Sequence, residues 1–183
     1  MCFRPQVFHA LERVAEQVVM GDFVIDPVAW KVSPFVALTV HELYALLQLR
    51  NEVFVVEQGC AFQDLDGSDR LALHLQGWAG DELVAYARCC GPQVKFAEAS
   101  IGRIVTRGKT RGSGLGHVLV KRAMACIGES WGPQPIRIGA QARLKTFYQS
   151  HEFMDVGLPY VEDRIDHLEM LWHPQQPDTG TYR

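Results

Sequence analysis

The segment whose residue types most directly indicate chemistry is the turn from Arg111 to Gly116, with the sequence Arg-Gly-Ser-Gly-Leu-Gly. It follows an apolar stretch and leads into an amphipathic one, which predicts a strand, a turn and a helix in that order. Backbone N–H groups at a helix N-terminus attract anions, and glycines let the main chain approach an oxygen-rich ligand. We therefore expect the turn to bind phosphate groups such as a nucleotide pyrophosphate, with tight packing alone as the alternative interpretation.

Two common nucleotide motifs do not fit this turn. A P-loop ends in Gly-Lys-Ser or Gly-Lys-Thr, whereas Gly116 is followed here by His117 and Val118. A dinucleotide fingerprint starting at Gly112 would need a third glycine where His117 stands. The sequence therefore disfavours both nucleoside triphosphate hydrolysis and a Rossmann site.

Metal and thiol chemistry find little support. His41-Glu42 and His151-Glu152 each begin like a zinc-protease motif but lack the second histidine, so no metal site is predicted. The five cysteines form no CxxC pair and are odd in number, which indicates free, mostly buried thiols in a reducing compartment. No cysteine can be assigned a neighbouring base, which disfavours a cysteine nucleophile.

Composition indicates one folded domain. With 183 residues, of which 48% are hydrophobic and 21% charged, the chain can bury a sizeable core. A dispersed net charge of −3 gives no reason to expect nucleic acid or a membrane as partner. No apolar run reaches the roughly 20 residues of a membrane helix, and no signal-peptide core is present. We predict a cytoplasmic protein.

The order of predicted elements gives the fold class. A capping box at Thr39 and Glu42 starts a helix over about 40 to 54, and a weaker helix is predicted around 10 to 19. Further helices are expected from Leu115 and over 143–150, and strands over 73–78, 83–89, 100–106, 136–140, 153–160 and 167–172. This order predicts an α/β, or mixed α+β, fold whose mostly antiparallel sheet is flanked by helices. We expect an N-terminal appendage over 1–29, a domain over 30–173 and a loose tail over 174–183.

The motif Arg111-x-x-Gly114-x-Gly116, between a strand and a helix, resembles the phosphate-binding motif of the GNAT N-acetyltransferases. QARLKTFYQSHEF, from Gln141 to Phe153, resembles the later strand-helix segment of that family, with Glu152 where the family usually has glycine. ELYALLQLRNEVFVVEQGC, FQDLDG, ELVAYAR, IGRIV and GAQARLKTFYQS extend the resemblance to the ElaA-like subgroup over roughly 30–172. It implies a GNAT-like fold and acetyl transfer from acetyl-coenzyme A (acetyl-CoA), which leaves coenzyme A as product.

The resemblance also implies roles for particular residues. Tyr148 would approach the cofactor sulfur, and the strand before the turn would diverge from its neighbour and pair with the pantetheine arm. The residues implied to bind cofactor are Ile104, Val105, Thr106, Arg111, Gly112, Ser113, Gly114, Leu115, Gly116, His117, Gln141 and Phe147. For Phe147 and Tyr148 the alternative is an ordinary aromatic helix face.

Aminolysis of a thioester needs a polarised carbonyl, a neutral amine and a proton for the leaving thiolate. Tyr148, protonated at neutral pH, could donate that proton. Glu57 is the first candidate for the base, because a lone carboxylate in an apolar run is hard to explain by packing. The other candidates are Asp64, Asp66, His74 and His167.

The expected partner is a small-molecule or peptide amine. The acetyl group would be transferred to it directly within a ternary complex. Acidic residues between Glu57 and Asp69 hint at a cationic amine, although a solvated loop explains them equally well. A homodimer stays open. The alternative function is a non-catalytic module that binds or senses acyl-coenzyme A.

Overall fold

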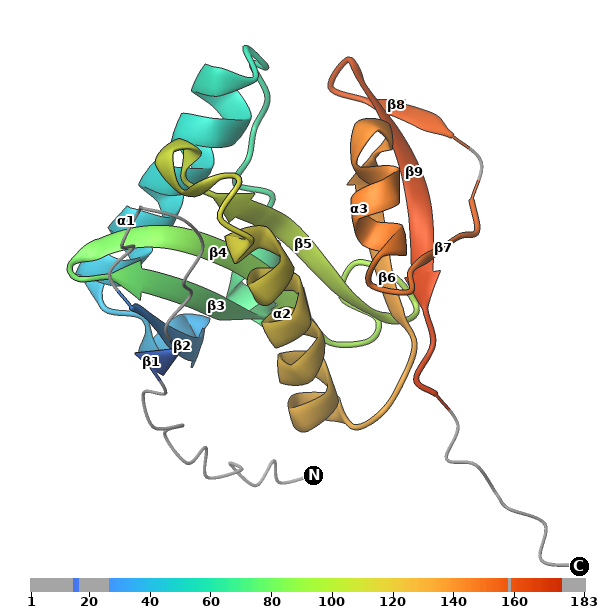
Figure 1. Ribbon diagram of the computed structural model, residues 1–183, viewed down its shortest axis with the longest axis horizontal. Helices are drawn as coiled ribbons and strands as arrows, with labels where there is room; N and C mark the ends of the chain where they lie inside the picture. The colour runs from blue at the N-terminus through green and yellow to red at the C-terminus, as the bar shows by residue number, and fades with distance from the viewer. Residues whose placement is uncertain (1–14, 17–26, 158, 176–183) are drawn as a thin grey trace, which may run out of the picture.

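The computed structural model describes residues 15–16, 27–157 and 159–175, and its backbone forms one mixed sheet (Figure 1). The strands run in the order β1-β2-β3-β4-β5-β6-β9-β7, and β8 pairs with β9. Their bounds are Ala15–Glu16 (β1), Val28–Pro34 (β2), Ala72–Ala79 (β3), Glu82–Cys90 (β4), Ala99–Thr106 (β5), Ile136–Gln141 (β6), Met154–Asp155 (β7), Tyr160–Glu162 (β8) and Ile165–Trp172 (β9). Only the β5–β6 pair among these is parallel, which confirms the mixed, mostly antiparallel sheet.

Three helices cover the sheet: α1 (Val40–Arg50), α2 (Leu115–Trp131) and α3 (Lys145–Gln149). The predicted capping box is present, because Thr39 accepts from the Glu42 amide while the Glu42 side chain accepts from the Thr39 amide. After Arg50 the helix continues with π-helical geometry over Asn51–Glu57 (η2), past the predicted end at 54. Shorter 3-10 turns occupy Phe35–Ala37 (η1), Ser68–Leu71 (η3), Gly108–Thr110 (η4) and Ala142–Leu144 (η5). Within the described part of the chain, no helix is long and apolar enough to cross a membrane.

The core has two parts, one on each face of the sheet. Ala85, Ala87 and Cys89 of β4 belong to the cluster that packs under α2, and Tyr86 between them belongs to the cluster under α1. This alternation follows from the pleat of a strand, in which successive side chains point to opposite faces. Helices on both faces therefore leave β4 and β5 buried in the centre, and Figure 1 shows α2 crossing the sheet.

Some sequence predictions need correction. Strand β2 was not predicted, although Val28 and Trp30 are buried and pair with β3. The predicted strand over 153–160 is instead two short strands, β7 and β8. The predicted helix around 10 to 19 lies outside the described residues except for Ala15 and Glu16, which form β1.

Strands β5 and β6 separate soon after they meet. They pair only at Ala99 with Ile136 and at Ser100 with Arg137, and beyond these residues the two strands diverge (Figure 1). On its other edge β5 carries a bulge, since Tyr86 and Arg88 of β4 oppose Val105 and Gly102 and leave one extra residue on β5. Arg103 lies in this bulge with φ of 51°. The separation leaves backbone groups of β5 without a strand partner on the side facing β6.

An ion cluster holds the segment between η2 and β3 against the sheet beside this bulge. We use that name for Arg50, Arg88, Lys95, Arg103, Asp64, Asp66 and Asp69. Oδ1 of Asp69 accepts from Nη1 of Arg50 at 2.8 Å and from Nη1 of Arg88 at 3.0 Å. Asp64 joins Arg50 to the bulge, because its Oδ1 accepts from Nε of Arg103 at 2.6 Å. The cluster therefore fixes the bulge through a buried cation.

The cluster keeps its carboxylates ionised. Burial opposes the ionisation of Asp69, but the charges and hydrogen bonds of Arg50 and Arg88 outweigh it and hold the pKa below its ordinary value. Burial likewise opposes the ionisation of Asp66, and hydrogen bonds from Arg88 and Lys95 hold its pKa well below the usual range. Because both pKa values are lowered on folding, the stability they contribute is present above about pH 5 and is lost as the pH falls further.

We expect Asp69→Asn to lower the free energy of unfolding at pH 7 by about 3 kcal/mol, because two buried guanidinium groups lose a shared carboxylate. Urea denaturation at several pH values measures this. Wild type should lose stability more steeply than the variant below about pH 5. Asp81→Asn, at an exposed residue of the β3–β4 turn, is the control and should change little. Equal acid profiles for wild type and Asp69→Asn would contradict the role given to the cluster.

Candidate functional site

The glycine turn adopts the geometry of an anion-binding helix start. Gly112 and Gly114 have φ of 81° and 84°, a left-handed conformation that favours glycine, and α2 begins directly afterwards at Leu115. The hydroxyl of Ser113 donates to the Thr110 carbonyl at 2.7 Å, which ties the turn down. A Cβ added at Gly112 would meet no protein atom within 4 Å, so the chain is open to an approaching ligand there.

The turn also presents unpaired backbone donors. The amides of Gly112, Ser113, Gly114 and Gly116 make no hydrogen bond to an acceptor in the described part of the chain. The amide of Leu115 makes only a long one, at 3.4 Å to the Ser113 hydroxyl. Donors clustered at the positive end of a helix are the groups that phosphate oxygens bind. The arrangement can therefore hold a pyrophosphate.

The basic residues near the turn already have acidic partners. Arg111 forms a two-point ion pair with Glu57, in which Nη2 donates to Oε2 at 2.8 Å. Arg107 pairs with Glu52 and Glu82, and Lys109 pairs with Glu82. Without a ligand, the unpaired donors of the turn are therefore its backbone amides and not these cations.

Helix α3 lies against the turn through its aromatic residue Phe147. The Phe147 ring is 4.7 Å from the ring of His117, and it would lie 3.6 Å from a Cβ built on Gly116. Nδ1 of His117 lies 3.0 Å from Nε2 of His151 behind it. Burial, together with the nearby His117, lowers the pKa of His151. Phe147 therefore lies beside the glycine turn.

Tyr148, the expected acid, is buried next to Phe147 and Phe153. Burial raises the pKa of its phenol above the ordinary value of 10, so the hydroxyl stays protonated at neutral pH. In the described residues no group hydrogen-bonds to this hydroxyl. The phenol therefore keeps its proton and shares it with no acceptor in the described part of the chain.

Two amide side chains, those of Gln58 and Gln141, meet at the end of β6. Nε2 of Gln141 donates to Oε1 of Gln58 at 3.1 Å, and Nε of Arg143 donates to Oε1 of Gln141 at 2.9 Å. Gln141 thus pairs with Gln58 and Arg143, not with the glycine turn. Because Gln58 directly follows Glu57, the end of η2 lies between the glycine turn and the end of β6.

The candidate bases differ in their surroundings. The hydrogen bond and charge of Arg111 lower the pKa of Glu57. His74 is fully buried with both ring nitrogens occupied, by the Tyr86 hydroxyl and the Asp69 carbonyl, and Asp64 and Asp66 belong to the ion cluster. These contacts leave Glu57 and His167 as the candidates outside the cluster and its partners.

His167 lies opposite Gln141 on β9. Its Nδ1 is 2.8 Å from the Ile165 carbonyl, which can only accept, so Nδ1 carries a hydrogen and Nε2 is the basic nitrogen of the neutral ring. The ring stacks on Tyr160 with centroids 5.5 Å apart. His167 is thus oriented to accept a proton at Nε2.

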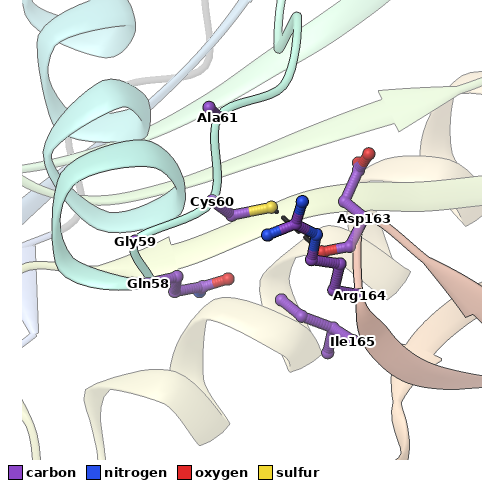
Figure 2. Close-up of a pocket in the computed structure, with 7 residues that line it drawn as sticks. All are labelled: Gln58, Gly59, Cys60, Ala61, Asp163, Arg164 and Ile165. Carbon is purple, nitrogen blue, oxygen red and sulfur yellow. Dashed lines mark hydrogen bonds between the residues drawn. The ribbon is translucent and has the colours of Figure 1, made fainter.

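A pocket of about 330 Å³ lies between residues 58–61 and the turn joining β8 to β9 (Figure 2). Its lining residues are Gln58, Gly59, Cys60, Ala61, Asp163, Arg164 and Ile165. The thiol of Cys60 donates to the Asp163 carbonyl at 3.1 Å across the pocket. Gln58 therefore links this pocket to Gln141 and the end of β6.

Sequence reasoning missed Gln58, Cys60 and Arg164 as site residues. Gln58 and Cys60 flank a glycine just after Glu57, but nothing local indicates that a hairpin about 100 positions later covers them. Of the cysteines the structure describes, Cys89, Cys90 and Cys126 are buried and Cys60 is half-buried, and all are free thiols. No group of three metal-ligating side chains occurs among the described residues.

Known proteins are similar to this chain in sequence and in fold. A family model for the acetyltransferase (GNAT) domain matches residues 53–173. Protein ElaA of Escherichia coli K12 is 41% identical over 145 residues, covering 78% of this chain and 95% of ElaA. A crystal structure of an acyl-CoA N-acyltransferase from Pseudomonas aeruginosa has a TM-score of 0.76 at 41% identity and covers 79% of this chain and 98% of its own. The crystal structure of Escherichia coli ElaA has a TM-score of 0.74 at 40% identity, with the same coverage. The chain therefore belongs to the GNAT acetyltransferase family and is a homologue of ElaA.

Proposed function

We propose that this protein is an N-acetyltransferase that moves an acetyl group from acetyl-coenzyme A directly to an amine held in the same complex. The observation that carries the proposal is the combination of two features at one place. The β5–β6 pairing stops after two residue pairs, and the next turn presents four amides without an acceptor in the described chain. An extended arm ending in a pyrophosphate needs both an unpaired strand edge and an anion site.

The residues present fit coenzyme A. The unpaired amides of Gly112, Ser113, Gly114 and Gly116 would hold the pyrophosphate, and Phe147 would pack beside it. The His117 amide already donates to the Gly114 carbonyl at 2.9 Å. Backbone groups of Ile104 and Thr106 would pair with the pantetheine arm, because β6 leaves that edge of β5 free, whereas Val105 between them is paired with Tyr86 of β4. Gln141 would hydrogen-bond the pantetheine arm only if it gave up its hydrogen bond to Gln58 or to Arg143. When bound, acetyl-coenzyme A supplies a thioester whose acyl carbon is open to attack.

The remaining chemistry is proton transfer to and from side chains of the protein. The nitrogen–carbon bond forms as the carbon–sulfur bond breaks, one amine proton leaves to a base, and the sulfur takes up a proton. Tyr148 is the proposed donor of that last proton, because its phenol is protonated at neutral pH and no described residue hydrogen-bonds to its hydroxyl. An unpaired amide of β5 near Val105 would stabilise the developing negative oxygen.

Glu57 is our proposed base, and its ion pair with Arg111 suggests how it is activated. Arg111 belongs to the phosphate turn, so an arriving pyrophosphate competes with Glu57 for the guanidinium. Loss of that partner raises the pKa of Glu57 toward its ordinary value, because the Arg111 hydrogen bond is what lowers it. The carboxylate would thus become a better base only after the cofactor is bound.

We expect Glu57→Gln to lower turnover by about 100-fold while coenzyme A binds at least as tightly as in wild type. The substitution removes the base but also frees Arg111 for phosphate and removes a negative charge from the turn. Single-turnover rates across pH, with calorimetric coenzyme A affinities, test this. His167→Gln is the paired variant. If Glu57→Gln keeps the wild-type pH–rate profile and His167→Gln loses its acidic limb, His167 is the base instead.

We expect Tyr148→Phe to slow acetyl transfer by about 100-fold with little change in coenzyme A affinity or melting temperature. The ring and its packing remain, and the lost hydroxyl has no described hydrogen-bond partner. Thiol release with a panel of amines, read with the mass of the acetylated product, measures the transfer.

Tyr86→Phe is the matched control for Tyr148→Phe. The Tyr86 hydroxyl is 2.9 Å from Nδ1 of His74, so its loss should lower stability and not chemistry. Wild-type transfer by Tyr148→Phe would remove the role assigned to Tyr148. Coenzyme A binding without thiol release for any amine would instead favour the sensing module.

A further inference from the structure

The acids near the proposed site are already paired. Asp64, Asp66 and Asp69 bind arginines and Lys95 in the ion cluster, and Glu57 binds Arg111. The hint in the sequence of a cationic acceptor recognised by these residues therefore loses its support. A cation would find no unpaired member of this group to bind before the cofactor arrives.

An unpaired cation lies at the pocket instead. Arg164 lines the pocket, and in the described part of the chain its guanidinium has no acidic partner. Figure 2 shows this guanidinium turned toward Cys60, above Gln58, while the carboxylate of Asp163 points away from them. The pocket therefore presents a positive group together with the amide of Gln58 and the thiol of Cys60.

The backbone at Arg164 is strained. Asp163 and Arg164 form the two-residue connection between Glu162 and Ile165, which pair with each other, and have φ of 51° and 66°. A two-residue turn with both residues left-handed favours Asn-Gly or Asp-Gly, so Asp163 suits the first position whereas Arg164 is unusual at the second. Strain of this kind tends to persist where a side chain has a function. The backbone strain and the unpaired charge therefore occur at the same residue, Arg164.

We infer that the acceptor amine carries an anionic group, a carboxylate or a phosphate, which Arg164 binds in this pocket. The inference rests on the proposed acetyl transfer and names its substrate class. An arginine fork binds a carboxylate or phosphate by two parallel hydrogen bonds. The anion on Arg164 would leave the amine of a small acceptor to extend past Gln58 toward the end of β6, where the strands are apart.

Matched acceptors test the inference on the full chain. Phenylalanine is compared with phenylalaninamide, and phosphoethanolamine with ethanolamine, so that each pair differs in the anion. Wild type should show kcat/KM at least about tenfold higher for an anionic member than for its partner, as one charge-assisted contact provides. The pair with the larger ratio distinguishes carboxylate from phosphate.

Arg164→Gly should raise KM for the preferred anionic acceptor about tenfold or more and leave KM for the partner that lacks the anion unchanged. Its melting temperature should stay equal or rise, because glycine relieves the left-handed backbone. Arg70→Gln removes an exposed arginine that has no ion pair among the described residues, and it should leave both ratios at wild-type values.

Wild type that prefers the amines without an anion, or Arg164→Gly with an unchanged ratio, would overturn the inference. Calorimetry that measures binding of the same acceptors with coenzyme A present tests this inference separately from the proposed function. Binding of the anionic member that depends on Arg164, without acetylation of any amine, would support the pocket and reject acetyl transfer. Absence of both binding and acetylation would reject the two together.

Discussion

The site depends on one constraint: β5 and β6 are held together at one end and kept apart at the other. The parallel pairing at Ala99 and Ser100 anchors the two strands, and the bulge at Arg103 and the turn after Thr106 carry β5 away. Separated strands in a sheet expose unpaired backbone groups, which is costly unless a ligand or solvent satisfies them. An extended ligand arm is suited to that edge, and the amides before α2 are suited to its charged end.

Charge pairing supports this arrangement. The ion cluster ties Arg103 of the bulge to buried Arg50 through Asp64, so the strand geometry is fixed from the α1 side of the sheet. Desolvation offsets much of the attraction within such a buried cluster, whereas loss of one member leaves a buried charge unpaired. The Glu57–Arg111 pair is different, since both side chains are partly exposed and a phosphate can replace the carboxylate. One set of charges thus holds the fold, while the other can respond to a ligand.

How far the sequence predicts the site depends on how local each feature is. The Thr39–Glu42 capping box and the strand–turn–helix order around the glycine turn are encoded by residues close in sequence, and the structure confirms both. The strand divergence came only from the family resemblance, because no local pattern encodes it. The Glu57–Arg111 pair joins positions 54 apart, so only the assembled sheet brings it together. The turn at Asp163 and Arg164 was not predicted, because Asp163 is a common turn residue but Arg164 after it is not. Glu152 likewise takes φ of 66° where the family usually has glycine.

Hydrogen exchange of the backbone amides with and without coenzyme A tests the central claim most directly. If coenzyme A occupies the gap between β5 and β6, amides in 104–106 and 112–117 should become protected, with little change in the β2–β3 pair. Gly114→Asp places a side chain and a negative charge at the turn, so it should lose the protection of 104–106 and 112–117 while the β2–β3 amides exchange as in wild type. Coenzyme A that binds wild type but protects other segments, or that protects Gly114→Asp equally, would contradict the account.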